Sequence, residues 1–251
     1  MKPWVLATIC FIFLVLSAVF LRMKPDQPAK PKVPKVSQTE KPELQIEQYK
    51  LPRIQNAEFI RLEKLWSEST AGTAVWQERG WEVSNWLNKN GMQVEAALFA
   101  ARIASTQANE QNWQKVTEYG LQYFMSAKPD LRQDTLTLLS EIASKKGLEL
   151  NSKNPAFRTA IVMQDFEKNP MIAVTALKSI ETEFPDYDPV QKILVSLSLR
   201  SGQWDKAEKR LQNLMRKLPK DPIVNCLMVD LLEMTNRSSE AESYLINCFK
   251  K

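Results

Sequence analysis

The stretch that decides the fold reads DPVQKILVSLSLRSGQWDKAEKRLQNLMRKLPKD and covers residues 188–221. Apolar residues recur at helical spacing on both sides of Gly202, and a glycine suits the left-handed turn that links two helices. The small Ala207 lets the second helix approach the first, Leu211 fills the seam between them, and Pro219 stops the second helix. The stretch therefore predicts two antiparallel helices that pack on each other.

The same pattern returns with a period of 34 residues in the last part of the chain. Small, apolar, turn-forming and helix-ending residues each fall in step across two or three copies. The matching sets are Ala173, Ala207 and Ala241; Leu177, Leu211 and Leu245; Ile180, Leu214 and Cys248; Gly202 and Asn236; and Pro185 and Pro219. Agreement of several sets predicts a repeated structural unit, because stacked units bury a continuous core that one unit cannot.

A 34-residue period made of two helices resembles the tetratricopeptide repeat, and residues 188–221 are its best copy. The resemblance implies an all-α fold in which helix pairs stack into a right-handed α-solenoid. We expect three such repeats in 154–251. The first of them lacks the turn glycine, and the last ends without a separate capping helix.

Upstream, in 57–153, the 34-residue register fails and we expect degenerate helical repeats. Residues 93–130 keep a helix–turn–helix–proline layout, with Trp113 near the start of the second helix. A further helix is expected to open at Pro129, Asp130 and Leu131, to run through Lys145 and to be closed by Gly147. Five or so helix pairs would then build one continuous core.

Residues 57–91 predict two helices with a high aromatic content, from Trp66, Trp76, Trp81 and Trp86. The last three are spaced by five, and each such step on a helix turns the side chain by about 140°. Tryptophans placed in this way cannot form one stripe for a ligand. We therefore expect them to be buried between neighbouring helices.

An uncharged stretch from Trp4 to Leu21, WVLATICFIFLVLSAVFL, predicts a transmembrane helix, so residues 1–22 are assigned to an N-terminal anchor. A helix of this length is about 27 Å long, just enough for a hydrocarbon core of roughly 30 Å. A cleaved signal peptide is the alternative. The run is longer than the hydrophobic region of a usual signal peptide and ends in VFLR, a poor cleavage site, so we favour the uncleaved anchor.

Residues 23–56 predict a linker rich in proline and lysine. Pro25, Pro28, Pro31 and Pro34 recur every third residue, which is typical of a polyproline II spacer. Basic residues after the hydrophobic span favour a cytoplasmic domain by the positive-inside rule. The very short tail before the span and the composition of the linker favour an extracytoplasmic one. We expect a single-pass protein of a bacterial inner membrane whose C-terminal domain lies outside the cytoplasm.

The composition removes much catalytic and metal-binding chemistry. The chain has no histidine, which excludes Ser-His and Cys-His pairs and every metal site that contains histidine. Its three cysteines, Cys10, Cys226 and Cys248, are too few for a four-cysteine zinc site. The last two would reach similar heights in one helix pair, but the repeat register turns them apart, so we expect free thiols rather than a disulfide. We assign no catalytic residue, no cofactor and no metal.

The resemblance implies that a partner protein binds in a groove lined by the first helices of the repeats. The positions in this groove would be Arg158, Val162, Asp165, Phe166, Lys192, Ser196, Leu199, Arg200, Asp230 and Glu233. A carboxylate clamp would pair a lysine with an asparagine four residues later. Here Lys192 is followed by Ser196, so that clamp is not supported. The alternative, that these positions are only solvated helix faces, stays open.

These patterns together predict a membrane-tethered scaffold for protein–protein interactions, an adaptor of a membrane or envelope assembly, and not an enzyme. Self-association through the repeats stays open. The second hypothesis is an exported soluble helical-repeat protein whose leader is removed, and the third is a helical enzyme with paired carboxylates. The repeat at 188–220 is basic on its second helix, but it lacks the interleaved aromatic residues of a nucleic-acid binder. We interpret this charge as a solvated convex face.

Overall fold

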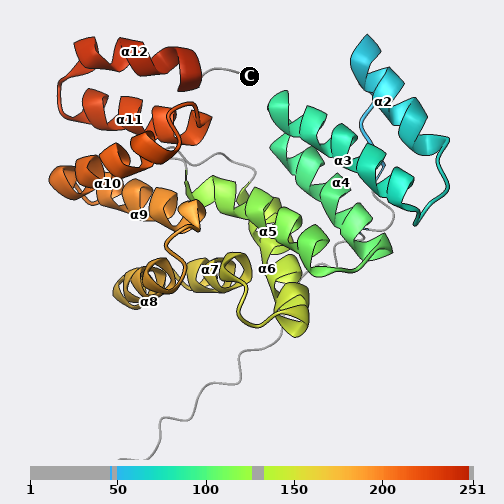
Figure 1. The fold of residues 1–251 in the computed structure, drawn as a ribbon, viewed down its shortest axis with the longest axis horizontal. Coiled ribbons are helices and arrows are strands. Elements are labelled where there is room, and N and C mark those ends of the chain that lie inside the picture. The colour runs from blue at the N-terminus through green and yellow to red at the C-terminus, as the bar shows by residue number, and fades with distance from the viewer. Residues whose placement is uncertain (1–45, 47–49, 126–132, 249–251) are drawn as a thin grey trace, which may run out of the picture. The chain divides into compact units, whose positions relative to one another are not determined.

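The computed structural model describes Ile46 and residues 50–125 and 133–248, and these residues form helices and no β-strand (Figure 1). Within this part of the chain, no helix is both long and apolar enough to cross a bilayer. The predicted anchor at 1–22 lies outside the described residues, as does the linker apart from Ile46 and 50–56. The prediction of an all-α fold is confirmed.

The helices follow one another with short connections. In chain order they are α2 (Ala57–Ser67), α3 (Ala74–Lys89), α4 (Gln93–Thr106), α5 (Glu110–Phe124), α6 (Gln133–Leu150), α7 (Pro155–Gln164), α8 (Pro170–Glu183), α9 (Asp188–Arg200), α10 (Trp204–Lys217), α11 (Pro222–Met234) and α12 (Ser238–Cys248). Each helix contacts the next one in the chain. This order of contacts is what a train of helical hairpins produces.

Side-chain caps start the first two helices. The Asn56 side-chain oxygen accepts hydrogen bonds from the backbone N–H groups of Glu58 and Phe59, at 3.0 and 3.1 Å. The Thr73 hydroxyl accepts one from the backbone N–H of Trp76 at 3.2 Å. The first N–H groups of a helix have no partner within the helix, and these bonds satisfy some of them. The capping residues Asn56 and Thr73 therefore set where α2 and α3 begin.

The tryptophans of α2 and α3 lie in the core, as predicted. Trp66, Trp76, Trp81 and Trp86 are all buried. Trp66 packs edge-on against Phe99 of α4, with 4.8 Å between the ring centroids. The large rings therefore hold α2, α3 and α4 together.

Helix α6 is longer than predicted, because it continues through Gly147 to Leu150. The prediction that Gly147 closes this helix was wrong. A Cβ atom at this position would lie 2.3 Å from the ring of Phe157, so the missing side chain gives α7 room to approach. Gly120 of α5 has the same role against Ser140 of α6, where a Cβ would again lie 2.3 Å away. Both glycines serve close helix packing rather than a turn.

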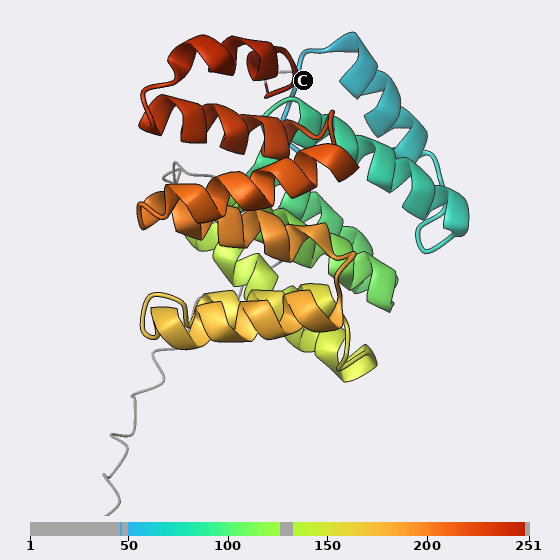
Figure 2. The ribbon, with the colours of Figure 1, turned by 60° about the vertical axis from the view of Figure 1, so that its left-hand side comes forward.

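From α7 to α12 the described chain forms successive helix pairs that keep the 34-residue register. Gly202 and Asn236 both adopt left-handed backbone angles, with φ of 69° and 59°, at equivalent turns. Ala207 and Leu211 are fully buried between helices, as the repeat requires. Figure 2 shows α9 to α12 as neighbouring layers. The pairs α7/α8, α9/α10 and α11/α12 are each in contact. Their assignment to three tetratricopeptide-like repeats stays a prediction.

Helix α5 links the N-terminal helices to the C-terminal helix pairs, because it contacts α4 as well as both α7 and α9. Leu121 of α5 and Met125 just after it share a buried cluster with Ile193 and Leu194 of α9. Helices α8, α10 and α11 also contact α9. With neighbours on so many sides, α9 buries even a polar side chain such as Ser196.

The last helix pair is closed by a disulfide between Cys226 and Cys248, with 4.6 Å between the Cα atoms. The prediction of two free thiols was wrong. Cys226 follows the start of α11 and Cys248 is the last residue of α12, so the antiparallel hairpin brings them to the same end. The repeat register predicts that the two side chains point in different directions. It does not take into account that the ends of α11 and α12 approach each other closely, which brings the two sulfur atoms together.

Candidate partner-binding groove

Three of the predicted groove residues lie in the interior instead. Lys192, Ser196 and Leu199 of α9 are buried, with Ser196 at 0% and Leu199 at 1% exposure. The reason is the packing of α9 among α5, α8, α10 and α11, which leaves no open face along these positions. The prediction that these residues line an open groove was wrong.

Lys192 has a structural partner in this interior. Its Nζ atom lies 2.7 Å from a carboxylate oxygen of Asp221. The other carboxylate oxygen of Asp221 accepts a hydrogen bond from the backbone N–H of Val224 at 3.0 Å, which caps α11. The charge on Lys192 therefore joins α9 to the start of α11 and is not presented to a partner.

The other predicted groove residues keep at least part of their surface exposed. They are Arg158, Val162, Asp165, Phe166, Arg200, Asp230 and Glu233. Arg158 already forms an ion pair with Glu183 at 2.6 Å, and Asp165 forms one with Lys168 at 3.4 Å. Phe166 and Val162 pack against the cluster around α7 to α9. Their assignment to a partner groove stays a prediction.

A different hollow lies between the second helices of two consecutive pairs, with a volume of about 610 Å³. We call it the α8/α10 groove. Its lining comes from α8, α9, α10 and the connections between helices: Phe166, Pro170, Met171, Val174, Lys178, Leu194, Leu197, Ser198, Ser201, Gln203, Lys206, Lys209, Arg210 and Asn213. Only Phe166 belongs to the predicted set, so the sequence reasoning missed this surface.

The floor of the α8/α10 groove is apolar. Leu194 and Leu197 of α9 form its base, with Val174 of α8 and Phe166 beside them. Met171 lines one side and is 77% exposed. A flexible, polarizable methionine at the edge of an apolar hollow is typical of binding surfaces that adapt to a partner.

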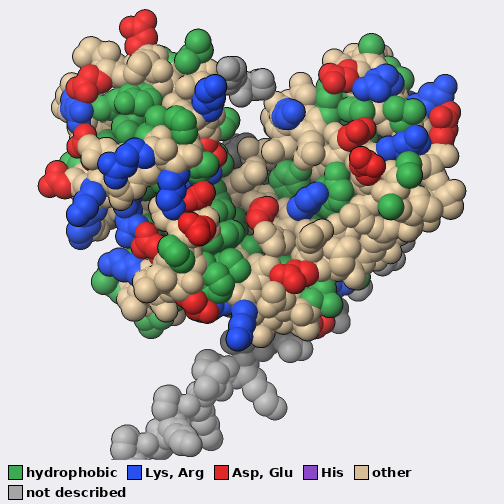
Figure 3. All heavy atoms as spheres, viewed as in Figure 1, with side chains coloured by type: hydrophobic (Ala, Val, Ile, Leu, Met, Phe, Trp, Pro, Cys, Tyr) green, Lys and Arg blue, Asp and Glu red, His purple; other side chains and the backbone are tan. Residues whose placement is uncertain are grey.

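The rim of the same groove is basic. Lys178, Lys206, Lys209 and Arg210 line it, and no Asp or Glu of the described chain is among the lining residues. Arg210 is already neutralised, because its guanidinium pairs with both carboxylate oxygens of Glu181. On the face in Figure 3, Lys and Arg side chains lie over α10 and its neighbours, with Asp and Glu side chains among them. The net result is a positive edge around an apolar base.

None of the three rim lysines has an ionic partner among the described residues. Lys178 and Lys209 are exposed and form no ion pair with the part of the chain that the structure describes. Lys206 donates a hydrogen bond to the neutral side chain of Gln203 at 2.6 Å. Three positive charges of the rim are therefore free to meet an anionic group.

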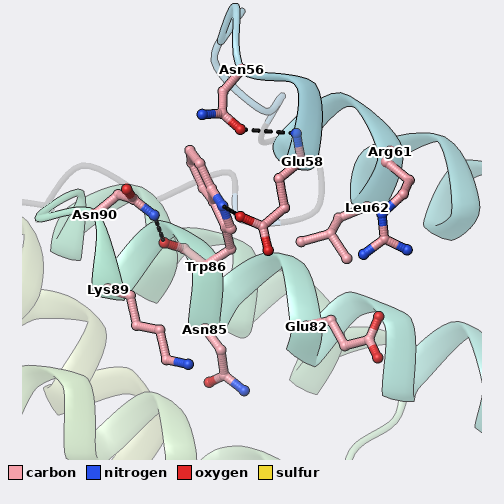
Figure 4. Close-up of a pocket in the computed structure, with 9 residues that line it drawn as sticks. All are labelled: Asn56, Glu58, Arg61, Leu62, Glu82, Asn85, Trp86, Lys89 and Asn90. Carbon is pink, nitrogen blue, oxygen red and sulfur yellow. Dashed lines mark hydrogen bonds between the residues drawn. The ribbon is translucent and has the colours of Figure 1, made fainter. Parts of the chain in front are cut away.

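A second hollow of about 540 Å³ lies between α2 and α3 and is polar (Figure 4). Its tryptophan, Trp86, donates a hydrogen bond from Nε1 to Glu58 at 3.1 Å. The side chain of Asn90 donates to the backbone oxygen of Trp86 at 2.8 Å. Opposite charges from Arg61 and Glu82 also line it. Polar groups that already satisfy one another and carry both signs make this hollow the weaker candidate.

Burial raises the pKa of the Glu118 carboxyl on α5 above its ordinary value, which a hydrogen bond from Gln114 and the charge of Lys115 only partly oppose. Burial also raises the pKa of the Tyr187 hydroxyl, and the charge of Glu118 adds to that shift. The charged neighbour of Glu118 here is a cation, whereas paired acid–base hydrolysis uses two carboxyls. Within the described ranges, no group of three acidic or sulfur side chains could hold a metal ion.

Comparisons of this chain with protein-family models, with curated proteins and with solved structures return no match.

Proposed function

We propose that this protein is a membrane-tethered scaffold that binds another protein through tetratricopeptide-like helix pairs stacked as a right-handed solenoid. The observation that carries the proposal is the α8/α10 groove, with its apolar floor and unpaired lysines. Exposed apolar surface rimmed by charge is typical of protein interaction sites, whereas an apolar surface without a partner is costly in water. No catalytic chemistry is needed to account for this groove.

The tether is the uncharged stretch at 4–21, which has the length and composition of a single transmembrane helix. The disulfide between Cys226 and Cys248 supports a location of the C-terminal domain outside the cytoplasm. Disulfides persist in oxidising compartments and are rare where thiols are kept reduced. The domain would therefore face an envelope compartment, at the end of a proline-rich spacer.

Site-specific photo-crosslinking in intact cells tests the binding function. A photoreactive amino acid replaces Asn213, an exposed residue that lines the α8/α10 groove. The matched control replaces Asn85, an exposed asparagine that lines the polar hollow between α2 and α3. The proposal expects a discrete heavier adduct from position 213 and not from position 85. No adduct from either position, or equal adducts from both, would overturn it.

Membrane extraction tests the tether. Alkaline carbonate should leave the full chain in the membrane pellet, and N-terminal sequencing should find residue 1 or 2 at its start. A chain released by carbonate, with an N-terminus near residue 22, would instead identify an exported soluble protein.

A further inference from the structure

One hollow open to a partner lies between the second helices of two pairs, whereas the middle of the first helix α9 is enclosed. Lys192 and Ser196, where the first helices would be expected to receive a peptide, are buried beneath neighbouring helices. By contrast, the α8/α10 groove is open between α8 and α10 and is floored by α9. Docking therefore needs no rearrangement of the described helices on this side.

Large apolar side chains are exposed at the start of α8, next to the groove. Met171 and Ile172, at the start of α8, are 77% and 70% exposed. The equivalent positions one repeat later are Asp205 and Lys206, which are polar. Met171 lines the groove and Ile172 follows it on α8, so two adjacent large apolar side chains stand where the next repeat has polar ones. Their burial by a partner would remove apolar area from water, which favours binding.

The basic rim of the groove favours a negatively charged partner. The free cations of the rim are Lys178, Lys206 and Lys209, while the guanidinium of Arg210 is engaged by Glu181. Complementary carboxylates would be attracted over a distance of about one Debye length, roughly 8 Å at physiological salt. A basic partner would meet repulsion from three lysines.

Other anionic macromolecules fit this surface less well. Phosphate groups of nucleic acids favour the planar fork of a free arginine, and single strands need exposed aromatic rings on which bases stack. The arginine of the rim is occupied, and the aromatic ring in the lining, Phe166, is already packed against the α7 to α9 cluster. A flat lipid surface would contact the rim without filling a hollow of about 610 Å³.

From these observations we infer that the α8/α10 groove receives an acidic segment of another protein, with at least one large apolar side chain that enters the groove between flanking carboxylates. This inference rests on the proposed scaffold function, since it names the class of partner for the same surface. The apolar side chain contacts Leu194, Leu197 and Met171, and the carboxylates pair with the lysines of the rim.

Fluorescence anisotropy with the full chain in detergent micelles tests the inference. The probes are three labelled peptides: one with Phe-Leu between Glu and Asp residues, one with Phe-Leu between Lys residues, and one with Ser-Ser between Glu and Asp residues. Only the first should bind with measurable affinity, and its dissociation constant should rise with salt. Equal binding of the acidic and basic peptides, or no binding of the first peptide, overturns the inference.

Charge-reversal variants test whether the peptide binds at the basic rim. Lys178→Glu with Lys209→Glu should weaken binding of the acidic peptide about tenfold or more. The matched control, Lys153→Glu with Lys220→Glu, changes two exposed lysines outside the groove and should leave binding unchanged. Circular dichroism verifies that both variants remain helical. Equal losses in the two double variants would overturn the assignment to this groove.

Apolar variants test the mouth of the groove. Met171→Ser should weaken binding, while Ile246→Ser, which removes an apolar side chain that is 73% exposed on α12, should not. Stronger binding to phosphatidylglycerol vesicles than to the acidic peptide overturns the inference in favour of a lipid surface. If the peptides fail while the adduct from position 213 forms in cells, the class of partner is wrong and the scaffold function stands. If both fail, the function fails as well.

Discussion

Breaking the bond between Cys226 and Cys248 should loosen the last helix and leave the other helices folded. The bond joins residues that are 22 apart in the sequence. A loop of this length restricts the unfolded chain by about 3 kcal/mol at 25 °C. The effect should concentrate on α12, because Ala241 is its buried residue while Tyr244 and Leu245 are only partly buried. A terminal helix with so little buried surface depends on its covalent tie.

Urea unfolding with and without a thiol reductant measures this effect, and hydrogen exchange locates it. Reduction should lower the free energy of unfolding of the last helix pair by about 3 kcal/mol and should speed amide exchange in α12 first. The control carries Cys226→Ala and Cys248→Ala and should be insensitive to reductant. Every sample also carries Cys10→Ser, so that a reductant can act only on the bond between Cys226 and Cys248. A reductant effect well under about 1 kcal/mol, or faster exchange spread evenly over α7 to α12, would refute the reasoning.

Three further predictions concern a turn, a helix contact and a buried charge. Gly202→Asn should be nearly neutral because Asn236 occupies the equivalent turn, whereas Gly202→Val should cost about 1–2 kcal/mol at a φ of 69°, as urea unfolding would measure. Gly147→Ala should cost about 1–3 kcal/mol because the new methyl group meets the ring of Phe157, and adding Phe157→Leu should recover part of the loss in melting temperature. Glu118→Gln should stabilise the protein at neutral pH, as thermal unfolding would show, because burial disfavours the charged carboxylate.

The pH dependence follows from the sign of the shift at Glu118. Its pKa is higher in the folded chain than in the unfolded chain, so its favourable contribution is complete below the ordinary pKa and is lost as the pH rises through the folded pKa. Wild-type protein should therefore gain stability as the pH falls from neutrality, and Glu118→Gln should gain less. The control Glu167→Gln, at an exposed position, should follow the wild-type profile.

Each of these predictions has an outcome that contradicts it. Equal stabilities of Gly202→Asn and Gly202→Val would mean that the turn is not held in the left-handed conformation. An unchanged melting temperature in Gly147→Ala would mean that α6 and α7 do not approach closely. Parallel pH profiles for Glu118→Gln and the wild type would mean that this carboxyl is not buried in solution.

Local signals predict the fold of the C-terminal helices well. Gly202 and Asn236 mark turns that need a left-handed residue, and Ala207 marks the point where two helices touch. Each of these requirements belongs to one or two residues and can be recognised without knowledge of their neighbours. The same holds for the tryptophans of α3, whose spacing excludes a single exposed stripe.

Long-range contacts explain what the sequence did not predict. From the sequence alone, Gly147 is typical of a helix end. Its role as a point of close helix packing becomes visible only when the position of Phe157 is known. Lys192 and Ser196 read as exposed first-helix positions until α9 is known to be enclosed by helices from other parts of the chain, α5 among them. The α8/α10 groove depends on the gap between two helices that are not adjacent in sequence. A signal was nevertheless present, because Met171 and Ile172 break the polar pattern of the later repeats.

Hydrogen–deuterium exchange of the full chain tests the central claim most directly, with and without the protein captured by crosslinking at position 213. If that protein occupies the α8/α10 groove, exchange should slow at the amides of 170–178 and 204–213 and remain unchanged in α2 and α3. Protection confined to α2 and α3, or no protection in α8 and α10, would contradict the account.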